Sequence, residues 1–162
     1  MKVFNGVKDF AKSVGREIGV SEWRVITQRD IDVFAEVTND PQWIHVDAER
    51  AARGPFGTTV AHGYLTLSLI PGLVRTVYRV DGLDMAVNYG SNKVRYPAPV
   101  PTGAAVRARV KLLSVEQSDT WSQSVIQVTI ERREESGSNP KPGCVAEIVS
   151  RLYETAGMPS GS

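Results

Sequence analysis

Hydrophobic positions divide the chain into a first half with helical spacing and a second half with alternating spacing. In the second half, four segments are rich in Val, Ile, Thr, Tyr and Arg, and stretches such as 106–112 and 125–130 alternate apolar with polar residues. Short turn-forming segments separate the four, which favours an antiparallel meander. The predicted strands cover residues 84–98, 104–117, 120–134 and 143–155.

The first half begins with two predicted amphipathic helices. Residues 3–13 place apolar side chains on one face of a short helix, and the run 23–26 is typical of an edge strand. The second helix runs to about Val37. We expect Thr27 to cap it, with Asp30 three residues later in a near capping-box position.

The longest apolar segment, residues 60–79, is apolar on nearly every side, which is typical of a buried helix. Pro71, followed by glycine, predicts a kink or an early end within it. One long buried helix with four or five antiparallel strands predicts an α+β fold, in which a curved sheet wraps around a central helix. We expect a single domain over residues 1–155 and a disordered tail over 156–162.

Composition narrows the functional classes. The 162 residues are 41% hydrophobic and 23% charged, which describes a soluble globular protein. A net charge of +1 gives no support for nucleic-acid binding. The single Cys144 excludes an intrachain disulfide and a cysteine-based zinc site, and it fits a reducing compartment. Without a signal segment or an apolar span, we expect a cytoplasmic protein with no membrane partner.

The connection after the second predicted helix carries the candidate chemistry. Asp40 precedes Pro41, which disfavours a helical conformation at Asp40, and His45 follows five residues after the aspartate. Asp47 is the expected N-cap of a short helix over residues 48–52, so we expect Asp40 and His45 on a non-helical loop between two helices.

A carboxylate and an imidazole on one loop can form an acid/base pair. Histidine titrates near neutrality, and a nearby carboxylate can orient it, hold a water or exchange protons itself. The spacing alone leaves a second interpretation open, in which Asp40 only turns the chain and His45 packs half-buried under Trp43.

Two motifs resemble the MaoC-like dehydratases, which include the R-specific enoyl-CoA hydratases. The first runs from Asn39 to Asp47 (NDPQWIHVD), and the second from Val60 to Thr66 (VAHGYLT). Residues 92–100 (NKVRYPAPV) are similar to a third family segment, so that the resemblance covers about residues 20–153. The sequence departs from the family in the first motif, where Gln-Trp replaces the usual Asn-Pro.

The resemblance implies a hot-dog fold, usually as a homodimer with the active site near the subunit interface. It also implies reversible hydration of trans-2-enoyl-CoA to (3R)-hydroxyacyl-CoA without a cofactor. By this resemblance Asp40 is the base, His45 binds the water and relays a proton, and the backbone N–H of Gly63 meets the thioester oxygen. The acyl chain is expected between the sheet and the central helix, beside Tyr64, Leu65 and Leu69.

The remaining histidine, His62, is interpreted as a packing residue that hydrogen-bonds to the preceding loop. Two histidines and one cysteine lying far apart along the chain predict no metal site.

Two alternative functions stay open. A hot-dog thioesterase would direct water at the thioester carbonyl, but thioesterases generally lack the histidine that follows Asp40 here. A non-catalytic acyl-binding subunit would not need both Asp40 and His45.

Overall fold

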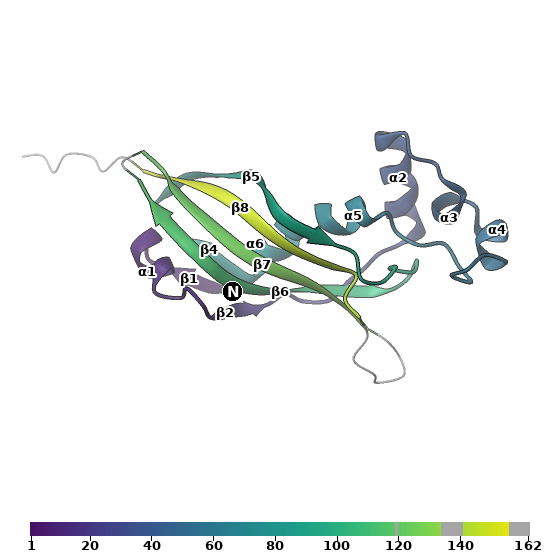
Figure 1. The fold of residues 1–162 in the computed structure, drawn as a ribbon, viewed down its shortest axis with the longest axis horizontal. Helices are drawn as coiled ribbons and strands as arrows, with labels where there is room; N and C mark the ends of the chain where they lie inside the picture. Colours follow the sequence, from purple (N-terminus) through teal and green to yellow (C-terminus); the bar gives the residue numbers. More distant parts are fainter. Residues whose placement is uncertain (119, 134–140, 156–162) are drawn as a thin grey trace, which may run out of the picture.

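The computed structural model describes residues 1–118, 120–133 and 141–155. The predicted tail and the end of the third predicted strand lie outside these residues. Figure 1 shows a long, curved sheet with a helical segment along one face and further helices projecting at one end. The elements are β1 (Lys2–Phe4), α1 (Val7–Ala11), β2 (Glu17–Val20), β3 (Arg24–Val25), α2 (Gln28–Thr38), α3 (Trp43–Val46), α4 (Ala48–Ala52), α5 (Gly63–Ser68), α6 (Ile70–Val77), β4 (Tyr78–Val80), β5 (Leu83–Arg95), β6 (Ala105–Gln117), β7 (Ser122–Arg132) and β8 (Cys144–Glu154).

The sheet confirms the four long strands but not their expected order. Its strands run β2-β6-β7-β8-β5, all antiparallel, with β3 beside β6. Strand β5 therefore pairs with β8, the last strand, and not with β6, which follows it in the chain. The predicted meander is wrong at this point, because alternation shows which face a side chain takes but not which strand lies beside it. The connection from β5 to β6, residues 96–104, does not form a tight turn between neighbouring strands. It runs past Val60, with which Pro101 forms an isolated antiparallel bridge.

One face of the sheet forms the core. Along β6 and β7 every second residue is buried over most of the strand, as the alternation predicted. Fully buried side chains on this face include Val110, Val128 and Ile130. They pack with the inward residues of the helical segment, Leu65, Ile70 and Leu73. A curved antiparallel sheet around a central helical segment is the hot-dog fold.

The central helix is interrupted, as Pro71 predicted. It divides into α5 and α6 at Leu69. Proline has no N–H, so the helix loses one backbone hydrogen bond there, although the N–H of Leu73 still donates to the carbonyl of Leu69. The expected range 60–79 is too long, because Tyr78 already begins β4. Tyr64 is 70% exposed, so the segment is not buried on every side.

The predicted helix over residues 3–13 is also too long. Its first residues form β1, which pairs in parallel with β4, and only Val7–Ala11 is helical. Strand β2 was not predicted, because it is short and contains a glycine. No helix of the described residues is long and apolar enough to cross a membrane.

Candidate active site

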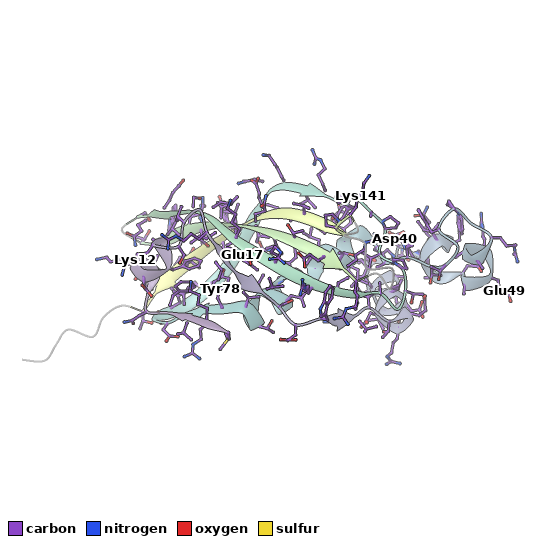
Figure 2. The ribbon with its side chains drawn as sticks, turned by 90° about the horizontal axis from the view of Figure 1, so that it is seen from below. Lys12, Glu17, Asp40, Glu49, Tyr78 and Lys141 are labelled. Atoms are coloured by element: carbon purple, nitrogen blue, oxygen red, sulfur yellow. The ribbon has the colours of Figure 1, made fainter. Side chains whose placement is uncertain are left out.

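The main chain of Asp40 is fixed by the end of α2. The helix begins with the predicted capping box of Thr27 and Asp30. It ends at Asn39, whose φ of 54° and ψ of 42° are left-handed, and the N–H of Asp40 donates to the carbonyl of Ala35 at 3.0 Å. A left-handed residue followed by this six-to-one bond is the Schellman motif. The motif turns the chain out of the helix at Asp40, which lies toward the same end of the molecule as Glu49 of α4 (Figure 2). The side chain of Asp40 is 59% exposed.

His45 lies in a helix, contrary to the prediction of a loop. Trp43–Val46 form the single turn α3, and Asp47 then caps α4 as expected, accepting a hydrogen bond from the N–H of Arg50. Proline constrains the residue before it, so Pro41 keeps only Asp40 out of helical geometry and leaves the residues after it free to form a turn. Trp43 lies under the guanidinium of Arg50, at 4.4 Å.

The protonated nitrogen of His45 is set by a backbone carbonyl. Its Nδ1 lies 2.6 Å from the carbonyl oxygen of Val60, and a carbonyl can only accept a hydrogen bond. Nδ1 therefore carries the hydrogen, and Nε2 of the neutral ring is left with a lone pair. The side chain is buried, at 7% exposure. Burial lowers the pKa of His45, and the neighbouring His62 lowers it further, whereas the Val60 carbonyl and Asp40 act to raise it.

His62 completes the group, which the sequence spacing did not indicate. Its ring stacks on that of His45 with centroids 3.7 Å apart and planes at 24°. Its Nε2 donates to the main-chain carbonyl of Asp40 at 2.9 Å, so the predicted hydrogen bond to the preceding loop is confirmed. The same nitrogen lies 3.9 Å from Oδ2 of Asp40, which is too long for a hydrogen bond.

Asp40, His45 and His62 offer potential ligand atoms that all lie within 4.8 Å of one another. The two histidines lie far apart along the chain but close together in the fold, so the sequence separation that argued against a metal site does not apply in space. The arrangement suits hydrogen bonding better than metal binding, since Nε2 of His62 is engaged with a carbonyl and the two rings lie face to face.

A second set of polar residues holds the main chain of His45. The amide nitrogen of Gln28, in the first turn of α2, donates to the carbonyl of His45 at 2.8 Å. The hydroxyl of Thr59 donates to the amide oxygen of Gln28 at 2.6 Å. Thr59 is 2% exposed, so this bond satisfies a buried hydroxyl. Sequence reasoning missed Gln28, because its contacts join segments that are 17 and 31 residues away.

Gly63 is the first residue of α5 and borders a cavity of about 250 Å³ beside Tyr96 and Thr66. A Cβ built on Gly63 would lie 3.1 Å from three ring carbons of Tyr96. Glycine therefore permits the close approach of this aromatic ring, which a larger residue would push away by a few tenths of an ångström.

The expected acyl-chain position is only partly supported. Tyr64 is too exposed to line a channel, and Leu65 belongs to the packed core. A larger cavity, about 440 Å³, lies further along, between α6 and the sheet, where Ile70 and Val74 face β5, β7 and β8. It shares no lining residue with the cavity beside Gly63.

The fold and the paired carboxylate and imidazole define a hot-dog protein with a candidate acid/base site. A family model described as a MaoC like domain matches residues 9–135. The chain is 48% identical over 151 residues to the 3-hydroxyacyl-thioester dehydratase Z of Mycobacterium tuberculosis, covering 93% of this chain and 98% of that protein. It is 40% identical over 157 residues to Nodulation protein N of Rhizobium leguminosarum bv. viciae, covering 94% and 95%.

A solved (R)-hydratase from A. caviae, involved in PHA biosynthesis, superposes with a TM-score of 0.66 at 21% identity, over 85% of this chain and 94% of that one. This likeness supports the fold. The chain belongs to the MaoC-like dehydratase family.

Proposed function

We propose that the protein catalyses the reversible hydration of a trans-2-enoyl-CoA to a (3R)-hydroxyacyl-CoA. The observation that carries the proposal is the approach of the Asp40 carboxylate to the buried His45, whose Nε2 has a free lone pair. The name of the mycobacterial relative, a 3-hydroxyacyl-thioester dehydratase, supports the same class of substrate.

In the proposed mechanism one water donates its two hydrogens to the two acceptors, a carboxylate oxygen of Asp40 and Nε2 of His45. As the water oxygen bonds to C3, Asp40 removes a proton, and the electron pair of the C2–C3 double bond moves toward the thioester oxygen. The proton held by Asp40 passes to Nε2 of His45, and the resulting imidazolium delivers it to C2 on the same face. This returns Asp40 to the carboxylate and His45 to its neutral form. The product gains one water and no other reactant is needed.

The charge that develops on the thioester oxygen requires a donor placed in advance, and we assign this role to the backbone N–H of Gly63. An N–H in the first turn of a helix has no partner within that helix. Gly63 also borders an open cavity, in which a thioester could approach its main chain.

A homodimer joined at β5 accompanies this proposal. Strand β5 is a long edge of the sheet, and it exposes Met85, Val87 and Tyr89. An unpaired, partly apolar edge is a template for pairing with a second copy. Light scattering coupled to size exclusion should give twice the mass of the 17.7 kDa chain, and a monomeric mass would reject this part.

The test is hydration of crotonyl-CoA, followed as loss of enoyl absorbance, with Asp40→Asn and His45→Gln measured beside the parent. We expect each variant to lose roughly 10²–10⁴-fold in kcat. Free thiol released without hydration would support the thioesterase instead. Binding of crotonyl-CoA and longer enoyl-CoA substrates without turnover would support the acyl-binding subunit.

A further inference from the structure

We infer that His62 is a positioning residue for the proposed pair, holding the main chain of Asp40 through Nε2 and the ring plane of His45 by stacking. This inference rests on the proposed function. It assigns His62 no contact with substrate.

The first part of the argument is that little else directs the Asp40 carboxylate. Within the described residues, no hydrogen bond joins that carboxylate to another group, and the side chain is more than half exposed. The place from which the carboxylate reaches the pair is therefore set by the main chain. The N–H of Asp40 is held by Ala35, inside the motif that ends α2, and the carbonyl is held from outside α2 by His62.

The second part concerns the His45 ring. Its hydrogen bond to Val60 holds the edge of the ring at Nδ1. His62 holds a face of the same ring, because the two rings stack with centroids 3.7 Å apart. Phe34 of α2 in turn lies 5.1 Å from His62, tilted by 52°, so three rings from three segments are packed in series.

The third part is that an apolar residue at this position would cost less free energy of folding than histidine does. His62 is 3% exposed, and its Nδ1 has no hydrogen-bond partner among the described residues. A buried polar atom without a partner carries an energetic cost that Phe or Leu would avoid. The cost is accounted for if the other nitrogen of the ring is needed for Asp40.

The two functions of the ring can be separated with two variants. His62→Phe keeps a flat ring over His45 and removes the donor to Asp40. His62→Gln keeps an N–H donor and removes the stack. Since a displacement of about 1 Å can cost about 10²-fold in rate, we expect His62→Phe to lower kcat by about 10- to 100-fold. KM for crotonyl-CoA should change by less than about 3-fold, because the substrate contacts remain.

His62→Gln should retain more of kcat than His62→Phe, and its effect should appear in the pH profile. The titratable groups that face His45 are Asp40, from the end of α2, and His62, from the start of α5. Removing His62 removes an influence that lowers the pKa of His45, so the acid limb should move to higher pH.

Nuclear magnetic resonance supplies a readout that does not depend on turnover. The chain has two histidines, so in either variant the remaining imidazole signals belong to His45 alone. We expect His62→Gln to alter the nitrogen shifts and the titration of His45. Leu73→Ala, in the core of α6, is the structural control: it should lower stability without changing kcat per folded molecule.

The outcomes distinguish this inference from the proposed function. If the parent does not hydrate enoyl-CoA, the proposed function fails. If the parent is active and both His62 variants keep its kcat and its His45 titration, the positioning role is wrong. The positioning role is also wrong if both variants behave like Leu73→Ala, so that they lose stability but their folded fraction keeps the full parent kcat.

Discussion

The sheet and the connection from Asn39 to Gly63 are held together by different interactions. In β7, apolar side chains such as Val128 and Ile130 are fully buried, and the main chain makes the hydrogen bonds. In the connection, polar side chains make the decisive contacts, while the apolar side chains of Val46 and Phe56 are 38% and 44% exposed.

This difference separates stability from activity. Burial of apolar area has no preferred direction, so the sheet tolerates changes that keep volume and pattern. A hydrogen bond needs a particular atom at a particular place, so a change of similar size in the connection displaces the candidate catalytic groups. We therefore expect substitutions in the sheet to act on the free energy of unfolding, and substitutions in the connection to act mainly on the rate.

The largest effect on stability should come from the sheet. Ile130→Ala should lower the free energy of unfolding by about 2–5 kcal/mol, because it leaves a cavity in a packed core. The milder Ile130→Val should cost about 0.5–1.5 kcal/mol. Urea unfolding measures both, and kcat per folded molecule should stay at the parent value. A stable variant with a reduced rate would contradict the separation.

Gln28 tests the boundary between the two regions. Gln28→Leu removes the support of His45 and leaves the buried hydroxyl of Thr59 unpaired, which should cost about 1–3 kcal/mol. The rate of hydration should also fall. In the double variant Gln28→Leu/Thr59→Val the orphan hydroxyl is gone, so its loss of stability should be smaller than the sum of the single losses. Additive losses measured by urea unfolding would show that the bond contributes nothing.

Asn39 tests the turn that aims Asp40. Its φ of 54° is costly for a β-branched residue, so Asn39→Val should lower the free energy of unfolding by about 1–2 kcal/mol and reduce kcat. Asn39→Gly, which adopts this conformation freely, is the matched control and should change both quantities little. Equal effects of valine and glycine in thermal unfolding and steady-state kinetics would argue against the turn as the cause.

The smallest effect should be seen on acidification. Because burial lowers the pKa of His45 below its ordinary value of about 6.5, the unfolded chain takes up this proton at higher pH than the folded one. The free energy of unfolding should therefore fall as the pH drops below about 6.5. Activity should persist below that pH and be lost once His45 is protonated.

Urea unfolding and kcat measured between pH 4.5 and 8 check both parts of this expectation. His45→Gln should lose this part of the pH dependence of stability. If the free energy of unfolding of His45→Gln changes with pH as steeply as that of the parent, the dependence belongs to another group.

Sequence alone predicted the elements well and their neighbours poorly. The four long strands, the capping box of Thr27 and the N-cap of Asp47 follow from local patterns, and the structure contains all of them. The pairing of β5 with β8 does not, since no local pattern records which strand lies alongside.

The same limit applied to the site. Asp40 and His45 stand close together in the sequence, so their pairing could be proposed from the chain. The stacking of His62 on His45 depends on the return of the chain at Val60, where its N–H bonds to the carbonyl of Ile44. Only the folded arrangement reveals that contact.

The position of β5 at the edge of the sheet has a consequence for the newly made protein. Arg95 is separated from its partner Val145 by 50 positions, and Leu83 pairs with Glu154 at the far end of β8. At about 5–20 residues per second, Arg95 is added to the chain about 3–10 s before Val145, its nearest partner residue. During vectorial synthesis this strand must wait without its sheet neighbour. A nascent chain that stops before β8 leaves β5 without its partner strand, and another chain can then pair with β5.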